Sequence, residues 1–389
     1  ATVCGLTTID IGIDESILRR MNSRTDKAEA LEEPVTVLIQ GRVYRDVSME
    51  LHGGLARSFE KKSYRLEFPA DDPPRLTFFG DEGDPAEPHR RLVLQAAWID
   101  PTFLRNKLTL DLERELGGVA PRVGFAMVYI NHKLYGLFSV IERIDREFLE
   151  RQGYNDGDAF NLYKAVDHLA NWGAKKNALD GFEIKINTGN PTDDLARLLR
   201  ALSETEATAG AFAAEVEPLL DLDRFMTWQM AHTFAQDRDT FTKNYYLYHD
   251  LAASAGTPEA RFRLIAWDAD ATWGLSWRGR AVGPDDEDWH GSDRFSPRLF
   301  SIPGYREVYL SRYREALERT MNRQTLLDRV ERLAGLIRKA TELDLYIWAR
   351  EVDLDAEMER LREAIRSRHS VMKAVITERM GEDTAGEGD

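Results

Sequence analysis

Apolar and polar residues alternate along much of the first third of the chain, a pattern typical of β-strands with one buried face. Gln40-Gly41-Arg42 and Asn131-His132 each separate two such stretches, and glycine or asparagine at these points suits a tight turn. The alternation therefore predicts two hairpins and two further strands in a mostly antiparallel sheet. The expected strands cover residues 34–39, 43–51, 62–68, 92–97, 123–130 and 133–142.

One helical repeat of apolar residues interrupts this predicted sheet. Leucine recurs every fourth residue within 101–116, which predicts a helix with one apolar stripe. Pro101 suits the first helical turn, Asp100 is a plausible cap, and Gly117-Gly118 would end the helix. Residues 69–90 are rich in Pro, Gly and Asp and are expected to form a loop.

The pattern changes in the second half of the chain, where helical spacing dominates. Residues 222–235 and 304–379 have this spacing and predict helices. Two short apolar runs, 245–249 and 261–267, predict a small strand pair between them. The last residues, 381–389, are acidic and are expected to form a disordered tail.

A chain of 389 residues exceeds what one hydrophobic core usually supports, so two lobes are expected. The order of elements predicts an α+β protein with an antiparallel-sheet N-lobe over residues 1–142. A mainly helical C-lobe with an embedded hairpin would follow over residues 143–380. This is the outline of a two-lobed kinase.

Charge and cysteine content narrow the classes of function. Acidic residues outnumber basic ones by 67 to 52, which gives a net charge of −15. This balance argues against a large nucleic-acid interface and is compatible with a basic protein substrate. Cys4 is the only cysteine, so an intramolecular disulfide and a cysteine-based zinc site are excluded. No apolar run is long enough to span a bilayer, and Ala1 in place of Met is compatible with a removed leader.

The strongest chemical pattern lies in the polar loop after residues 222–235. Asp239 is followed five residues later by Asn244, just before a predicted strand, and Arg238 directly precedes the aspartate. Protein kinases use this spacing in their catalytic loop, where Asp accepts the proton of the substrate hydroxyl and Asn binds magnesium. An isolated pair with this spacing more often caps a turn. The motif therefore needs support from elsewhere in the chain.

Asp268 provides that support because it ends the strand pair that follows the loop. Kinases place a metal-binding aspartate at this point. Magnesium prefers one or two carboxylates together with phosphate oxygens and water, so Asn244 and Asp268 would suffice. Asp270 is the alternative, as a second metal ligand or as a structural cap. The sequence thus predicts a magnesium-dependent phosphotransferase with Asp239 as its catalytic residue.

The chain contains a series of distinctive blocks that span about residues 35–275. They are residues 52–54 and 59–66, 103–108, 131–137 with Glu142, 161–164, 239–248, 267–270 and 273–274. In this order, the blocks resemble the spore-coat protein H (CotH) kinase family, a group of atypical, secreted or spore-associated protein kinases. The family commonly has arginine where this chain has His52, so the glycine turn would offer fewer side-chain donors here.

The resemblance implies that the chain binds ATP and Mg²⁺ and transfers the γ-phosphate to Ser or Thr hydroxyls of proteins. Gly53 and Gly54 would offer backbone amides to the phosphates. Lys62 shares strand parity with the apolar face, which makes it the preferred phosphate-contacting and catalytic lysine. Lys61 is the alternative, on the expected solvent face. Arg105 would either face the phosphates or pair with a carboxylate.

Two acidic positions complete the expected site. The carboxylate partner of the lysine would come from the predicted helix 101–116, where Glu113 and Glu115 are both candidates. Glu142 ends the second hairpin, where a kinase has the interlobe connector whose backbone binds adenine. The Glu142 side chain could instead pair with a neighbour.

Two other functions fit the same scaffold. A kinase-like protein can transfer AMP in place of phosphate, and some fungal members of the family are surface ligands, which leaves a non-catalytic binding or adhesion protein as the second alternative. A metallohydrolase is disfavoured because the eight histidines show no zinc-ligand spacing. The expected partners are a nucleotide and a protein substrate. The residues select no compartment, whereas the resemblance implies a secreted, cell-surface or spore-associated location.

Overall fold

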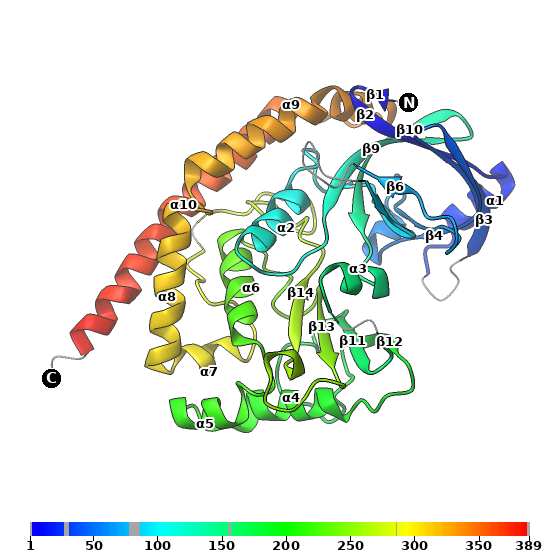
Figure 1. The fold of residues 1–389 in the computed structure, drawn as a ribbon. Coiled ribbons are helices and arrows are strands. Elements are labelled where there is room, and N and C mark those ends of the chain that lie inside the picture. Colours follow the sequence, from blue (N-terminus) through cyan, green and yellow to red (C-terminus); the bar gives the residue numbers. More distant parts are fainter. Residues whose placement is uncertain (1, 27–30, 78–85, 155–156, 285, 387–389) are drawn as a thin grey trace. The chain divides into compact units, whose positions relative to one another are not determined.

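The computed structural model describes residues 2–26, 31–77, 86–154, 157–284 and 286–386, and it is mixed α+β (Figure 1). The chain divides into two compact units that alternate along the sequence and do not follow the predicted boundary at residue 142. Unit 1 comprises residues 1–107, 121–148 and 330–359. Unit 2 comprises residues 108–120, 149–329 and 360–389.

Unit 1 contains a β-sheet that closes on itself. The strand order is β2-β3-β4-β5-β8-β10-β9, and β9 pairs with β2, so these seven strands form a barrel. Every pairing is antiparallel except the closing one, where Ile9 lies opposite Val128 in parallel register. The strands are β1 (Thr2–Val3, paired with β2), β2 (Leu6–Gly12), β3 (Glu32–Ile39), β4 (Arg42–Leu51), β5 (Tyr64–Glu67), β8 (Arg91–Gln95), β9 (Val123–Ile130) and β10 (Lys133–Glu142).

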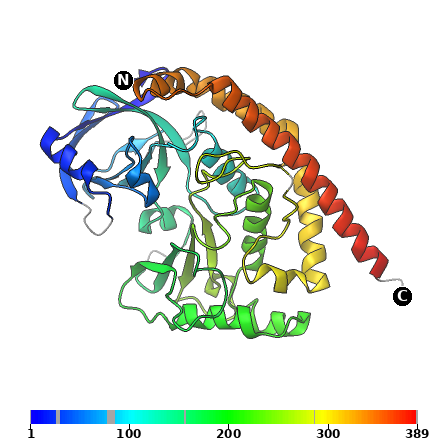
Figure 2. The ribbon, with the colours of Figure 1, turned by 180° about the vertical axis from the view of Figure 1, so that it is seen from behind.

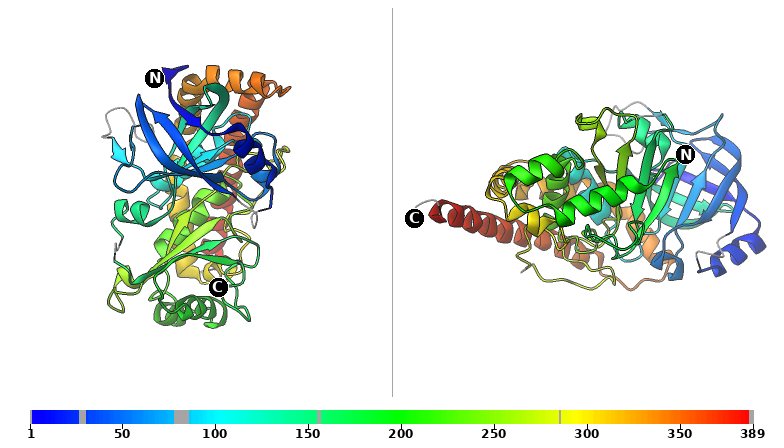
Figure 3. Two further views of the ribbon diagram at one scale, coloured as in Figure 1. Left: turned by 90° about the vertical axis from the view of Figure 1, so that its right-hand side faces the viewer. Right: turned by 90° about the horizontal axis from the view of Figure 1, so that it is seen from below.

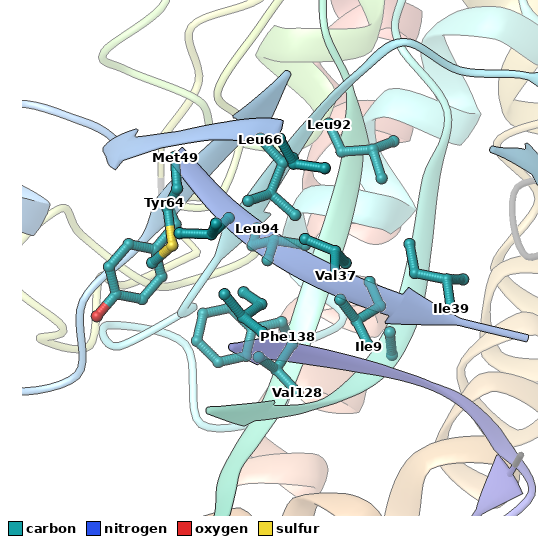
Figure 4. Packing of buried hydrophobic residues seen from close by; sticks show 14 of the residues in the cluster. Ile9, Val37, Ile39, Met49, Tyr64, Leu66, Leu92, Leu94, Val128 and Phe138 are labelled. Atoms are coloured by element: carbon teal, nitrogen blue, oxygen red, sulfur yellow. The ribbon is translucent and has the colours of Figure 1, made fainter. Parts of the chain in front are cut away.

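The inward-facing residues of the barrel form the core of this unit. Figure 4 shows Val37, Leu66, Leu94, Val128 and Phe138 pointing toward one another, and all are fully buried. Such alternation of buried and outward positions is what a strand with period two provides. Helix α1 (Glu15–Ser23) packs its apolar face onto this core, beside the blue strands of Figure 3.

Both predicted hairpins are confirmed. Gln40 and Gly41 connect β3 to β4, and Asn131 and His132 connect β9 to β10. All four residues have positive φ, between 52° and 83°. Two-residue turns of this kind match the right-handed twist of the strands that they join.

Unit 2 is built on a four-stranded antiparallel sheet in the order β12-β11-β13-β14. Trp172, Trp228 and Tyr245 pack beneath it, with Trp172 stacked on Tyr245 at 4.9 Å. The strands are β11 (Phe160–Ala165), β12 (Phe182–Asn187), β13 (Tyr245–Asp250) and β14 (Arg263–Ala266). The helices that lie wholly in this unit are α4 (Asp193–Glu204), α5 (Ala209–Glu215), α6 (Leu222–Phe234), α7 (Ser296–Phe300) and α8 (Pro303–Glu318).

The remaining elements are short or run through both units. Helix α2 (Arg105–Glu115) begins four residues later than predicted, because residues 101–103 form a turn and Asp100 Oδ2 accepts the Arg105 N–H at 2.9 Å. Figure 2 shows the long helices α9 and α10 in orange and red. These elements are β6 (Arg75–Leu76), β7 (Glu87–Pro88), α3 (Arg146–Arg151), α9 (Arg323–Ile347), α10 (Leu354–Gly386) and the single turns Leu55–Ser58 and Pro258–Ala260.

The end of the chain differs from the prediction. Helix α10 continues to Gly386, so the disordered tail expected from residue 381 is wrong for residues 381–386. Residues 387–389 of that predicted tail lie outside the described residues. Among the helices of the described part of the chain, none is both long and apolar enough to cross a membrane.

Candidate functional site

The loop between α6 and β13 brings Asp239 and Asn244 into direct contact. Asn244 Nδ2 donates a hydrogen bond to Asp239 Oδ2 at 3.0 Å, and Lys243 Nζ lies 3.1 Å from the same oxygen. The Asn244 backbone N–H donates to the Ala165 carbonyl of β11 at 3.0 Å. The Asp239 carboxylate is therefore held by two neighbours in a loop that is itself tied to the sheet.

A buried pair fixes the start of this loop. The Asp237 backbone N–H donates to the His232 carbonyl, and Asp237 Oδ2 lies 2.9 Å from His232 Nδ1. Both side chains are buried, and burial raises the pKa of Asp237 while His232 opposes the rise. Buried polar groups rigidify a segment when they find partners. The pair therefore fixes the point at which α6 turns into the loop.

Asp268 follows β14 and belongs to the same electrostatic cluster. Burial raises its pKa above the ordinary value, the Lys164 ammonium opposes this, and the carboxylates of Asp239 and Asp237 raise it further. The register explains the proximity, because Tyr245, next to Asn244, lies opposite Ala266 in β14. Asp239 and Asp268 thus act on each other as neighbouring charges.

The donors of this cluster fit a magnesium ion that also has phosphate and water ligands. No group of three or more His, Cys, Asp or Glu side chains within the described ranges could hold a metal ion. Asn244 and Asp268 instead match the sparse ligand set that Mg²⁺ uses beside phosphates. Both have left-handed backbones, with φ of 58° and 60°, which Asn and Asp adopt more readily than most residues. Asp270 lies half-buried in the loop beyond.

The structure reverses the expected exposure of the two adjacent lysines. Lys61 is only 1% exposed, so its expected solvent-face position is wrong. Its Nζ lies 2.5 Å from Asp344 Oδ1 of α9 and also donates to the Leu137 carbonyl. The rings of Phe103 and Phe138 flank the ammonium at 4.9 and 4.4 Å. The carboxylate partner of Lys61 thus comes from α9 and not from the predicted helix 101–116.

Lys62 lies outside β5, which begins at Tyr64, so strand parity does not extend to it. It is half-buried, and its Nζ donates to the Arg57 carbonyl at 2.7 Å. The buried Arg57 in turn donates to the carbonyls of Gly53 and Leu51 at 2.7 and 2.6 Å. These contacts hold the glycine turn from the inside.

The two glycines of this turn differ in their backbones. Gly53 has a φ of 91°, and a Cβ there would lie 2.9 Å from that of Ala56. Gly54 has a negative φ and precedes the turn Leu55–Ser58. A side chain at position 53 would therefore strain the turn, whereas Gly54 is not under this constraint.

Arg105 and Glu142 are both buried in ion pairs of unit 1. Arg105 Nη1 lies 2.6 Å from Asp100 Oδ1, which is the carboxylate pairing that the sequence left open. Glu142 accepts the Arg122 backbone N–H at 2.8 Å and its guanidinium at 2.9 Å. Each side chain thus has an internal partner that fixes a turn or a strand end.

The two glutamates considered for the lysine both lie in unit 2. Glu115 pairs with Arg329 at 2.5 Å. Glu113 is buried, and burial raises its pKa to about 7, against the opposing charges of His232 and Arg224. Glu113 is therefore a buried acid beside α6.

The Glu113→Gln variant is expected to stabilise the protein above pH 7. The folded state holds the Glu113 proton up to about pH 7, whereas the ordinary value is 4.5, so the folded state binds more protons between these values. The unfolding free energy therefore falls by up to about 3 kcal/mol as the pH rises through this window. Chemical unfolding at pH 5 and pH 8 should show a smaller pH effect in Glu113→Gln than in wild type. Glu115→Gln is the control, and an unchanged pH effect in Glu113→Gln would contradict the assignment.

Two features of these clusters, the partner of Lys61 and the position of Lys164, were not predicted from the sequence. Asp344 lies 283 residues from Lys61 in the chain, and no local pattern links them. Lys164 belongs to the block 161–164, but the sequence pattern did not predict β11 as a strand and so gave no position for its side chain. Recognition of the run Phe160–Ala165 as a strand beside β13 would have placed Lys164 close to Asp268.

Comparison with known proteins shows where this arrangement belongs. The family model described as "CotH kinase protein" matches residues 49–372. Inner spore coat protein H of Bacillus subtilis is 28% identical over 351 residues, which cover 88% of this chain and 91% of that protein. Invasin CotH3 of Rhizopus delemar is 26% identical over 189 residues, 46% of this chain and 30% of that protein.

Solved structures resemble the chain more loosely. The alignment with a chain from the Shewanella oneidensis complex of HipA, HipB and operator DNA covers 80% of this chain and 69% of the other chain, with 13% identity and a TM-score of 0.36. The alignment with the Helicobacter pylori proinflammatory kinase CtkA covers 75% of this chain and 91% of the other chain, with 10% identity and a TM-score of 0.31. At these TM-scores the likeness supports no functional argument. The match to the family model spans most of the sequence, and the chain therefore belongs to the CotH kinase protein family.

Proposed function

We propose that the protein is an ATP- and Mg²⁺-dependent protein kinase that transfers the γ-phosphate to Ser or Thr hydroxyls of a protein substrate. The observation that carries the proposal is the contact of Asp239 with Asn244, together with the electrostatic coupling of Asp239 to Asp268. Membership of the CotH kinase protein family supports it. On the same footing, we propose that the two units correspond to the N-lobe and C-lobe of a kinase-like fold.

Each residue of the cluster has a role in this proposal. Asp239 accepts the proton of the substrate hydroxyl. Meanwhile the hydroxyl oxygen bonds to the γ-phosphorus, and the bond between that phosphorus and ADP breaks. Lys243 and Asn244 keep the Asp239 carboxylate in position. Asn244 and Asp268 would hold Mg²⁺, which neutralises phosphate charge when bound, and Asp270 is the candidate for a further ligand.

The glycine turn of unit 1 is a candidate for phosphate binding in its own right. The backbone amides of Gly53 and Gly54 are the candidates, with Lys62 beside them. Lys61, Arg105 and Glu142 have buried internal partners, so we assign them a positioning role. In this respect the proposal differs from the expectation that they bind the nucleotide directly.

The net charge of −15 favours a basic protein substrate, since opposite charge speeds encounter. The names of two relatives, a spore coat protein and an invasin, favour a spore-associated or cell-surface location. The invasin likeness also keeps a non-catalytic binding role as the second candidate. A thermal-shift measurement separates the two, because only the kinase should be stabilised by ATP with Mg²⁺.

The Asp268→Ala variant is expected to lose Mg²⁺-dependent nucleotide binding. Asp268 supplies the first carboxylate that we assign to the metal, and a charged contact of this kind is worth about 1.5–3 kcal/mol, or roughly ten- to hundredfold in affinity. Calorimetric titration with ATP, with and without Mg²⁺, measures the effect. Asp250→Ala, at the half-buried end of β13 away from Asn244, serves as the control. An Asp268→Ala protein with wild-type affinity for Mg²⁺-ATP would remove this residue from the site.

A further inference from the structure

We propose that Lys164 binds the phosphate chain of the nucleotide at the Asp239–Asn244–Asp268 site. This inference rests on the proposed function and adds a residue to it. Lys164 lies near the end of β11, in the same unit as the three site residues. Its position follows from strand pairing, ring contacts and the charges around it.

Strand pairing places Lys164 beside the segment that contains Asn244. Lys164 lies opposite Tyr246 in the antiparallel pair of β11 and β13. The next residue, Ala165, accepts the backbone N–H of Asn244 at 3.0 Å. The last residue of β11 is thus hydrogen-bonded directly to one of the proposed metal ligands.

Two aromatic rings fix the direction of the Lys164 side chain. Its Nζ lies 5.5 Å from the centre of the Tyr246 ring and 5.3 Å from that of Trp267. Trp267 immediately precedes Asp268, and Tyr246 comes two residues after Asn244. An ammonium over two ring faces is stabilised by their negative charge density. The side chain is therefore held over two rings that lie within two residues of the proposed metal ligands in the sequence.

The charges of the cluster explain why a cation is needed there. The cluster contains three aspartates, Asp237, Asp239 and Asp268, and their like charges would repel a polyphosphate. A compact ammonium at this place can neutralise phosphate oxygens beside the metal.

The lysines of unit 1 are less suited to this role. Lys61 is buried against the Asp344 carboxylate and the Leu137 carbonyl, and displacing either would leave buried groups unpaired. Lys62 donates to the Arg57 carbonyl. Lys164 instead lies in the unit that contains the carboxylates proposed to receive a metal, over rings next to them in the sequence.

The test compares Lys164→Met and Lys164→Arg with wild type in the full chain. Lys175→Met is the matched control, because Lys175 also lies in unit 2, over the Phe182 ring at 4.4 Å. Calorimetry would measure binding of Mg²⁺-tripolyphosphate, AMP, ADP and ATP. We expect Lys164→Met to bind Mg²⁺-tripolyphosphate and ATP roughly ten- to hundredfold more weakly than wild type. Its affinity for AMP should change least. Lys164→Arg should retain part of the affinity, and Lys175→Met all of it.

The outcomes separate this inference from the proposed function. Equal weakening of AMP and ATP in Lys164→Met would show a merely structural role and overturn the inference. Wild-type affinity in Lys164→Met, with phosphate transfer by wild type, would also overturn it and leave the kinase standing. Binding of Mg²⁺-tripolyphosphate that depends on Lys164, without any phosphate transfer, would support the inference and contradict the kinase. If wild type binds none of these compounds, both proposals fail.

Discussion

The Asp239→Asn variant is expected to lose phosphate transfer by roughly 10²–10⁴-fold in kcat, the usual contribution of a positioned general base. The change removes the acceptor of the hydroxyl proton but keeps the size of the side chain. Its amide oxygen can still accept the hydrogen bond from Asn244, so the loop should keep its shape. Nucleotide affinity should therefore change little. Transfer of phosphate from labelled ATP to the chain itself or to a basic protein mixture measures the effect.

The control for Asp239→Asn is Asp223→Asn, since Asp223 lies in the same unit but is an exposed partner of Arg312. This variant should transfer phosphate at the wild-type rate. A wild-type kcat in Asp239→Asn would contradict the role of Asp239. Loss of nucleotide binding together with transfer would show a damaged loop and not a missing base.

The Asp344→Ala variant is expected to destabilise the protein by about 3–5 kcal/mol, because it leaves a buried ammonium without its carboxylate. Asp344 Oδ1 contacts Lys61 Nζ at 2.5 Å and accepts the Leu137 backbone N–H at 2.9 Å. Burial lowers the pKa of Lys61 to about 8, and Asp344 opposes that shift. Unfolding by urea, followed by circular dichroism, measures the loss.

The tightness of the site around Asp344 supports this expectation. Gly136 has a φ of 137°, and a Cβ there would lie 2.1 Å from Asp344 Oδ1. The indole of Trp348, the residue directly after α9, donates to the Tyr135 carbonyl at 2.8 Å. The carboxylate and the indole together attach this part of α9 to β10. Loss of Asp344 should therefore loosen a segment as well as an ion pair.

Two further variants complete the stability test. Asp355→Ala removes an exposed partner of Arg338 and should change stability little, as is usual for surface pairs. The double variant Lys61→Met/Asp344→Leu replaces both charges by apolar groups and should recover much of the stability lost in Asp344→Ala. An unchanged unfolding free energy in Asp344→Ala would contradict the assignment of a buried ion pair.

Local patterns were sufficient to predict the hairpins and the loop that contains Asp239 and Asn244. Gly41 and Asn131 adopt positive φ readily, as two-residue hairpin turns require, and this preference acts within two residues. The contact of Asp239 with Asn244 spans one short loop and follows from spacing. Such features depend on neighbours in the chain and are therefore visible in its sequence.

Long-range pairing was not predictable in the same way. The barrel closes through β2 and β9, which are more than a hundred residues apart and pair in parallel. The burial of Lys61 follows from the start of β5 at Tyr64 and from the approach of α9. Neither strand parity nor motif order carries that information, because tertiary packing decides which of two adjacent lysines is enclosed.

Asp239, Asn244 and Asp268 are proposed to form the site of a protein kinase. Mass spectrometry of the chain and a basic protein mixture, after incubation with ATP and Mg²⁺, provides the decisive test. We expect phosphate on Ser or Thr residues with wild type and none with Asp239→Asn. AMP in place of phosphate, no modification by wild type, or equal phosphate with both proteins would contradict it.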